Sequence, residues 1–173
     1  HFNYSFPNDL WVQVANQINK DLIEIKSEIY FKVLRNVYEM NWLLIYLFGS
    51  SPIISNELIR FDNDRFEKID SDSSMLPDAT SLRMSEYGYS NSERKKINVS
   101  LNSIEEYIRD LESATETIDQ NYLEFENSQL SPNFLQIEAE YYAVARAKSA
   151  QSTNTRPTTS LKNRGIDFIE IRS

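Results

Sequence analysis

Two ionisable side chains near the end of the sequence could take part in chemistry. Glu170 and Arg172 stand two residues apart in the strand-like run 165–173, and successive side chains of a strand alternate between its two faces. Both therefore share one face with Ile166 and Phe168. Because both faces of the run are largely apolar, we expect the strand to be buried. A buried charge is costly unless it is paired or holds a metal, so this carboxylate and guanidinium indicate a functional site.

The N-terminal part of the chain predicts a strand followed by helices. Residues 1–6 alternate between polar and aromatic side chains, and Pro7 ends the run. Residues 9–48 follow a helical pattern, which we interpret as two helices with Asp21 as the N-cap of the second. Gly49 is expected to end this helical region.

The C-terminal part predicts one more helix and two strands. Asn102 would begin a helix whose buried stripe fades near Gln120. Residues 134–142 favour a strand, and the polar residues 149–160 favour a loop before the last strand. Strands and helices in this order are typical of an α+β fold, in which helices pack against a sheet.

Composition excludes several kinds of site. The chain has 173 residues, a formal net charge of −8 and no cysteine. An acidic chain without a basic stripe argues against nucleic-acid binding, and the missing cysteines exclude thiolate zinc sites and cysteine nucleophiles within this sequence. The longest strongly apolar run, 42–48, is shorter than the roughly 20 residues that span a bilayer. We expect no nucleic-acid partner, no membrane partner and a cytoplasmic location.

Both ends of the sequence lie beside strand-like runs. His1 falls inside the first run and Ser173 directly follows the last, whereas domain ends are usually loose and polar. We therefore expect the sequence to be an internal piece of a longer protein.

Six segments of the chain, taken in order, resemble one known family. They are residues 1–7, 30–36, 46–52, 76–89, 135–143 and 165–173. Together they resemble the glutamate–cysteine ligase family of the type found in proteobacteria. One departure is local: the family often has prolines around residues 142–148, where this chain has Val144 and Ala147, which affects the expected backbone path more than the chemistry.

The resemblance implies an ATP-dependent ligase that joins the γ-carboxylate of L-glutamate to the amine of L-cysteine through an acyl phosphate, the first step of glutathione biosynthesis. It also implies a glutamine-synthetase-like α+β fold, a curved antiparallel sheet with packed helices whose concave face holds Mg²⁺, ATP and the other substrates. Residues 1–173 would then be the central part of a single catalytic domain with both flanks missing. We expect this piece alone to be inactive.

The resemblance also implies roles for eight residues. They are Glu170 and His1 as metal ligands, Arg172 and Arg83 in catalysis, Arg83, Tyr89 and Tyr142 at the substrates, and Arg146 and Lys148 at the nucleotide phosphates. Arginine suits a substrate carboxylate because its guanidinium binds carboxylates with two hydrogen bonds. Each residue also has a plain structural alternative, in which Glu170 simply pairs with Arg172 and the remaining charges lie on the surface.

Three functions stay open on the sequence alone. The first is the glutamate–cysteine ligase itself. The second keeps the fold but changes the chemistry, either to another amine acceptor or to the ligase half of a bifunctional glutathione synthase. The third is a non-catalytic helical interaction module, which would leave Glu170 and Arg172 exposed and far from Arg83 and His1.

Overall fold

Two compact units make up the chain in a computed structural model. The structure describes residues 2–59, 63–85, 87–88, 97–150 and 155–172. The first unit comprises residues 1–39 and 96–172, and the second comprises residues 40–95 with residue 173. The predicted pair Glu170 and Arg172 belongs to the first unit, and Arg83 belongs to the second.

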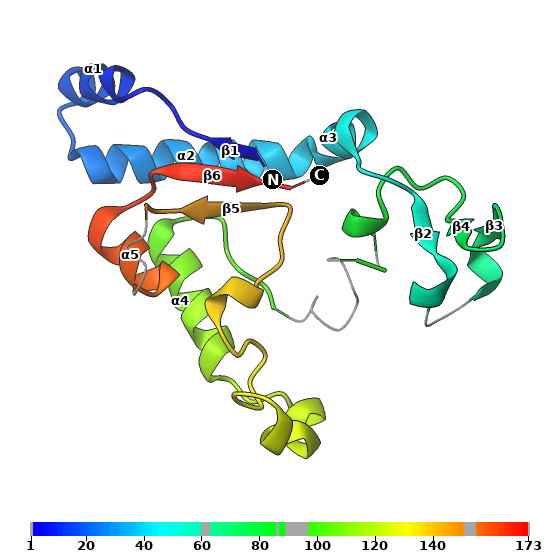
Figure 1. Cartoon of the computed structure of the whole chain (residues 1–173). Coiled ribbons are helices and arrows are strands. Elements are labelled where there is room, and N and C mark those ends of the chain that lie inside the picture. The colour runs from blue at the N-terminus through cyan, green and yellow to red at the C-terminus, as the bar shows by residue number, and fades with distance from the viewer. Residues whose placement is uncertain (1, 60–62, 86, 89–96, 151–154, 173) are drawn as a thin grey trace. The chain divides into compact units, whose positions relative to one another are not determined.

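The first unit is built on a three-stranded antiparallel sheet. Its strands are β1 (Phe2–Tyr4), β5 (Ala145–Lys148) and β6 (Phe168–Ile171), in the order β1-β6-β5 (Figure 1). The last strand of the sequence is thus the central strand of the sheet. In β6, Glu170 lies opposite Asn3 of β1 on one side and opposite Arg146 of β5 on the other.

The two faces of this sheet carry different side chains. Residues opposite one another in antiparallel strands share a face, so Glu170 shares its face with Arg146, and Lys148 shares it with Phe168. The other face carries Ala145, Ala147 and Ile169, which are all buried in the hydrophobic core. The alternation along β6 that the sequence predicted is therefore confirmed.

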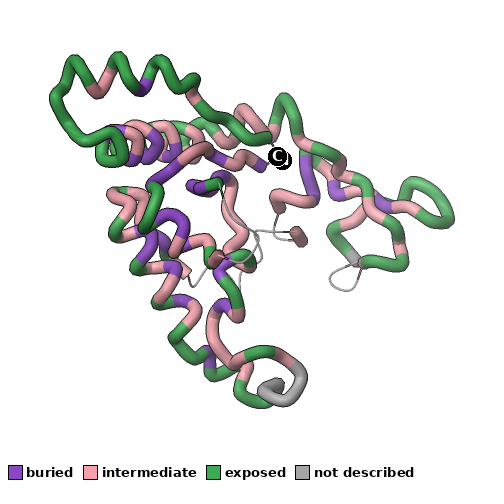
Figure 2. The backbone as a smooth tube through the Cα atoms, turned by 60° about the vertical axis from the view of Figure 1, so that its left-hand side comes forward, coloured by how far each residue is buried: buried purple, intermediate pink, exposed green. Residues whose placement is uncertain are grey.

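Four α-helices belong to the described part of the first unit, and two of them contribute more buried core residues than the others. They are α1 (Asn8–Ile18), α2 (Leu22–Glu39), α4 (Ile104–Glu116) and α5 (Pro157–Arg164). Buried positions recur along α2 and α4 (Figure 2), at the three- and four-residue spacing of an amphipathic helix. The core residues of these two helices are Tyr30, Phe31 and Leu34 on α2, and Tyr107, Ile108, Leu111 and Ala114 on α4.

Side-chain caps begin two of these helices, α2 and α4. Asp21 caps α2, because its Oδ1 accepts hydrogen bonds from the backbone N–H groups of Ile23 at 2.8 Å and Glu24 at 3.3 Å. This confirms Asp21 as the predicted cap. Ser103 caps α4 by accepting from the N–H of Glu106 at 3.2 Å, one residue beyond the predicted start.

Two sequence predictions in the C-terminal part were wrong. Residues 134–142 form no strand but contain the short 3₁₀ helix Glu138–Glu140, and the edge strand is β5 instead. The predicted loop 149–160 gives way to α5, which begins at Pro157. Proline suits the first turn of a helix, since the N–H it lacks would have no helical partner there.

Gly165 makes the turn that places β6 beneath α2. Its φ of +72° lies in the region that favours glycine. A Cβ added at this position would lie 2.7 Å from Cγ2 of Ile23 on α2. Any side chain here would therefore strain the backbone and force the side chain of Ile23 to shift.

The second unit has a helix and a small sheet of its own. The helix α3 (Asn41–Phe48) ends as predicted at Gly49, whose N–H donates to the carbonyl of Ile45 at 2.8 Å. The expected two helices over residues 9–48 are thus three. The unit also contains β2 (Ile53–Ser55), β3 (Glu67–Lys68) and β4 (Ser73–Met75) in the order β2-β4-β3, and the 3₁₀ helices Asn56–Leu58, Asn63–Arg65 and Leu82–Met84.

The two units together combine helices with antiparallel sheets, which confirms the predicted α+β class. Within the described ranges, every helix is too short or too polar to cross a bilayer.

Candidate functional site

One carboxylate with three cations around it forms the candidate site on the polar face of the first sheet. Glu170 Oε1 accepts hydrogen bonds from Arg146, through Nε at 3.3 Å and Nη2 at 2.9 Å. The same oxygen accepts from Arg172, through Nε at 3.2 Å and Nη2 at 3.0 Å. Lys148 Nζ lies 3.9 Å from the second oxygen, Oε2. We call these four residues the charged cluster.

The charged cluster is an electropositive spot in an acidic chain. Two guanidinium groups and one ammonium group outweigh a single carboxylate, so its formal charge is positive although the chain as a whole carries −8. The side chains of Arg172 and Glu170 are only 4% and 16% exposed. Because water screens such charges poorly, the cluster can attract an anion strongly.

Burial and pairing act in opposite directions on the ionisable groups of the cluster. Burial alone would raise the pKa of Glu170, but Arg146, Lys148 and Arg172 together outweigh burial and hold that pKa below its ordinary value. The carboxylate is therefore ionised at neutral pH. Burial, followed by repulsion from Arg146, lowers the pKa of Lys148.

Arg146 also binds the backbone beyond the sheet. Its Nη1 donates to the carbonyl of Ala139 at 3.2 Å and to the carbonyl of Tyr141 at 3.0 Å. A guanidinium has five N–H groups, and the four hydrogen bonds of Arg146 engage most of them. The turn at residues 139–141 is thereby tied to Glu170.

The same turn is fixed to α5 by a buried acid. Glu138 is 5% exposed, and its Oε1 accepts a hydrogen bond from the Thr158 hydroxyl at 2.8 Å. Arg156 Nε lies 3.5 Å from the same oxygen. A buried carboxylate is stable only with such partners, so α5, the turn and the charged cluster form one connected network.

Five of the eight predicted site residues come together in the first unit. Besides the four members of the charged cluster, Tyr142 belongs to this group, because the guanidinium carbon of Arg172 lies 5.3 Å from the centre of its ring. This distance is typical of a cation–π contact. These five side chains come from β5, from β6, from the residue that follows β6 and from the segment before β5.

The other three predicted residues are Arg83, His1 and Tyr89. Arg83 is half-buried in the 3₁₀ helix Leu82–Met84 of the second unit. His1 and Tyr89 lie outside the residues that the structure describes.

The described residues do not complete a magnesium site. Glu170 is the single acid of the charged cluster, and within the described ranges no group of three or more His, Cys, Asp or Glu side chains could hold a metal. Magnesium prefers six oxygen ligands in octahedral geometry, whereas the neighbours of Glu170 here are cations. By themselves these residues fit an anion better than a metal ion.

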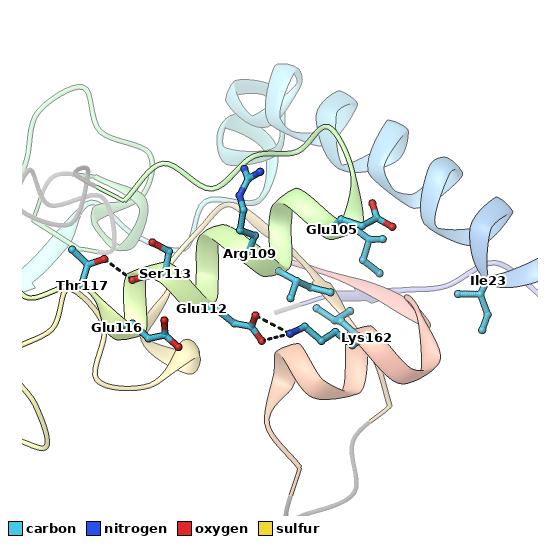
Figure 3. Close-up of a pocket in the computed structure, with 11 residues that line it drawn as sticks. Ile23, Glu105, Arg109, Glu112, Ser113, Glu116, Thr117 and Lys162 are labelled. Atoms are coloured by element: carbon cyan, nitrogen blue, oxygen red, sulfur yellow. Dashed lines mark hydrogen bonds and ion pairs between the residues drawn. The ribbon is translucent and has the colours of Figure 1, made fainter.

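A pocket of about 640 Å³ lies elsewhere in the first unit, between α4, α5 and Ile23 (Figure 3). Its rim is charged, and Lys162 and Glu112 form an ion pair across it at 2.7 Å. None of the eight predicted site residues lines it. We assign the site to the charged cluster because chemistry needs converging charged groups rather than volume alone.

Two residues beside the charged cluster received no role in the sequence analysis. Asn3 lies opposite Glu170 in the register, and the alternation of residues 1–6 would have placed it on this face. Glu138 lay in a segment that the sequence analysis quoted without a role. The backbone carbonyls that Arg146 binds leave no signal in a sequence, because any residue has a carbonyl.

Comparison with known proteins places the chain in a family. The family model described as glutamate–cysteine ligase matches residues 1–173. The chain is 37% identical to the glutamate–cysteine ligase of Hahella chejuensis and 38% identical to that of Aliivibrio salmonicida. The matches cover 99% and 100% of this chain but 34% and 35% of those proteins. The chain therefore spans about a third of the length of these relatives.

Solved structures of two other proteins resemble this chain. A glutamate–cysteine ligase from Francisella tularensis in complex with AMP matches with a TM-score of 0.85 and 36% identity, over 98% of this chain and 34% of that one. A bifunctional glutathione synthetase from Pasteurella multocida shares the fold, with a TM-score of 0.59 and 22% identity over 98% of this chain and 18% of that one. The match to the family model over the whole chain decides the assignment: this chain belongs to the glutamate–cysteine ligase family.

Proposed function

We propose that the full-length protein containing this chain is an ATP-dependent ligase that joins the γ-carboxylate of L-glutamate to the amine of L-cysteine, the first step of glutathione biosynthesis. Membership of the family supports the reaction. The charged cluster supports the use of a phosphate-bearing substrate, since its cations converge on one face of the sheet. A relative solved with AMP supports a nucleotide as that substrate.

The reaction consists of two group transfers, and the cations of the charged cluster favour both. A carboxylate is a poor electrophile, so an oxygen of the glutamate γ-carboxylate first attacks the γ-phosphorus of ATP and ADP leaves. The nitrogen of cysteine then attacks the acyl carbon, inorganic phosphate leaves, and the amine loses a proton. Negative charge shifts among the phosphate oxygens in both steps. Cations that are already held in place stabilise this charge without having to reorganise.

Arg172 and Lys148 are the proposed contacts to the phosphates. Arg172 directly follows the central strand β6. Its guanidinium lies against Glu170 and Tyr142, which fixes its direction. Lys148 Nζ is 3.9 Å from Glu170, beyond hydrogen-bonding distance, so its ammonium group can turn to a phosphate oxygen. Arg146, the second predicted nucleotide contact, has at most one N–H group left for a phosphate.

Magnesium is proposed as the partner of ATP. Glu170 would supply one oxygen ligand and His1 is the second predicted ligand, so the further oxygen ligands would come from the nucleotide, from water and from parts of the protein that this chain does not span. Bound there, the ion would neutralise phosphate charge. Mg²⁺ and both of its ligands therefore remain predictions.

Recognition of the two smaller substrates is assigned to three side chains. Arg83 is proposed to bind a carboxylate of glutamate, because a guanidinium matches a carboxylate with two parallel hydrogen bonds. Tyr89 and Tyr142 are proposed to line the pocket of the amine substrate. We propose a cytoplasmic location and small molecules as the partners of this site.

One observation carries the proposal: the nearly buried, hydrogen-bonded association of Arg172 with Glu170 on the central strand. A helical interaction module would give no reason for these charges inside the fold. The test is a panel of amines offered to the full-length protein with ATP, glutamate and Mg²⁺. A dipeptide formed with cysteine supports the proposal. A dipeptide formed only with another amine would retain the fold and replace the substrate, and no product with any amine would refute ligase activity.

A further inference from the structure

We propose that Arg146 is a positioning residue that holds Glu170 in place and does not bind the nucleotide. This inference rests on the proposed ligase function and concerns the same site. It replaces the nucleotide role that the resemblance implied for Arg146, and it leaves Lys148 as the cation of β5 that meets the phosphates.

The first argument is that most N–H groups of the Arg146 guanidinium already donate hydrogen bonds. Nε and Nη2 both donate to Glu170 Oε1, while Nη1 donates to two backbone carbonyls. Four hydrogen bonds leave one of its five N–H groups. A phosphate contact by arginine commonly uses two parallel N–H groups, so binding a phosphate in that way would require Arg146 to release Glu170 or the turn.

Location is the second argument. Arg146, whose side chain is 10% exposed, lies opposite Glu170 in the antiparallel register. Its guanidinium therefore lies between the central strand and the turn at residues 139–141. Lys148, two residues further along β5 on the same face, has a more exposed side chain at 22%. The more accessible cation of β5 is the one that lies 3.9 Å from Glu170.

The hydrogen-bond network around Arg146 is the third argument, because it shows which groups Arg146 holds in place. Arg146 links Glu170 to Ala139 and Tyr141, and the adjacent Glu138 is anchored to Thr158 of α5. Glu170 in turn accepts the hydrogen bonds of Arg172. Removing Arg146 therefore takes away two hydrogen bonds that hold the carboxylate on which Arg172 is oriented, and a small displacement of a catalytic group costs much of the rate.

The experiment uses four variants of the full-length protein. Arg146→Gln removes the charge and most donors, and Arg146→Lys keeps the charge but not the two-pronged geometry. Lys148→Gln removes the proposed phosphate contact. Arg109→Gln is the matched control, because Arg109 makes a similar two-pronged contact to Asp110, at 3.0 and 2.8 Å, on the exposed side of α4. Each variant is tested for ATP affinity, turnover at saturating substrates and melting temperature.

We expect Arg146→Gln to bind ATP within about twofold of the wild-type affinity and to lose about 10- to 100-fold in saturated turnover, the usual range for a residue that orients a ligand-binding group. Arg146→Lys should bind ATP normally and recover only part of the turnover. Lys148→Gln should weaken ATP binding about tenfold, and Arg109→Gln should match the wild type.

Several outcomes would overturn the inference. An Arg146→Gln protein that binds ATP about tenfold more weakly but retains its saturated turnover would make Arg146 a nucleotide contact. Unchanged turnover would leave it with no role in the reaction. If Arg146→Gln does not fold, Arg146→Lys decides by the same criteria, and loss of folding in both would make the role purely structural. A wild-type protein without cysteine-dependent turnover would refute the proposed function instead, and ATP affinity would still test the nucleotide role.

Discussion

At the scale of single residues, Glu170 organises the site. One of its oxygens accepts from two arginines and the other faces Lys148. The sequence predicted that Glu170 and Arg172 share a face, because alternation along one strand is a local property. It could not predict that Arg146 completes the group, since this depends on the register between two strands that are more than twenty residues apart.

The first prediction removes the charge of that carboxylate. Glu170→Gln in the full-length protein should abolish most Mg²⁺-dependent turnover, because the amide neither anchors two guanidinium groups nor serves as a good ligand for Mg²⁺. Turnover measured across a magnesium titration tests this. Glu112→Gln, at an acid that pairs with Lys162 away from the cluster, is the control. Wild-type turnover of Glu170→Gln at saturating Mg²⁺ would remove Glu170 as a metal ligand.

At the scale of elements, periodic segments were predictable and irregular ones were not. The core stripes of α2 and α4 were visible in the sequence because burial repeats with the helical period. The strand predicted for residues 134–142 was wrong because apolar and polar residues mix there without a clear period. Other parts of the chain fix this segment instead: the guanidinium of Arg146 binds two of its backbone carbonyls, and the hydroxyl of Thr158 binds the side chain of Glu138.

The helix α5 was missed for a different reason. Its residues Thr158, Thr159 and Ser160 are weak helix formers, so composition favoured a loop. Pro157 at its first turn was a readable start signal. The contacts that stabilise α5, to Glu138 and to α4, join distant parts of the chain, and packing of this kind regularly outweighs propensity.

Packing of α4 leads to the second prediction. Leu111 is 4% exposed in the core, whereas Leu130 is 80% exposed. Leu111→Ala should lower the free energy of unfolding by about 2–5 kcal/mol, the usual cost of a cavity left by a buried leucine. Leu130→Ala is the matched control and should change it by less than about 0.5 kcal/mol. Denaturant unfolding compares the two variants, and equal losses would contradict the position of α4 in the core.

The contact between α2 and β5 leads to a prediction about alkaline pH. The Tyr38 hydroxyl donates to the carbonyl of Ala145 at 3.3 Å, and burial, reinforced by nearby Tyr141, raises the pKa of Tyr38 well above that of a free tyrosine. Above about pH 10 the unfolded chain loses this proton while the folded chain keeps it. The free energy of unfolding should therefore decrease as the pH rises, by about 1.4 kcal/mol per pH unit from this one group.

The Tyr38→Phe variant isolates that contribution. Its free energy of unfolding should decrease less steeply between about pH 10 and 11 than that of the wild type, because phenylalanine has no proton to lose. Tyr46→Phe, at an exposed tyrosine, should keep the wild-type slope. Identical slopes for Tyr38→Phe and the wild type would mean that Tyr38 ionises freely in the folded protein.

At the scale of the whole molecule, the chain is two compact units that span about a third of the length of its curated relatives. The family was recognisable from six short segments of sequence, and the family model confirms it over residues 1–173. The prediction that these residues belong to one catalytic domain stays a prediction.

The incomplete metal site leads to a prediction about the isolated chain. Because the described residues hold no group of three potential metal ligands, residues 1–173 alone should release no phosphate from ATP in the presence of glutamate, cysteine and Mg²⁺. A phosphate-release assay that runs the full-length protein in parallel measures this. Turnover by the isolated chain at the rate of the full-length protein would show that the site needs nothing more.

The most direct test of the account is phosphate release from ATP by the full-length protein, with glutamate and Mg²⁺, measured with and without cysteine. We predict release that depends on cysteine and that falls by at least about 100-fold in Arg172→Gln, because this guanidinium is proposed to stabilise the transferring phosphoryl group. Release that is absent with every amine, or that is unaffected by Arg172→Gln, would contradict the assignment of the charged cluster as the site of phosphoryl transfer.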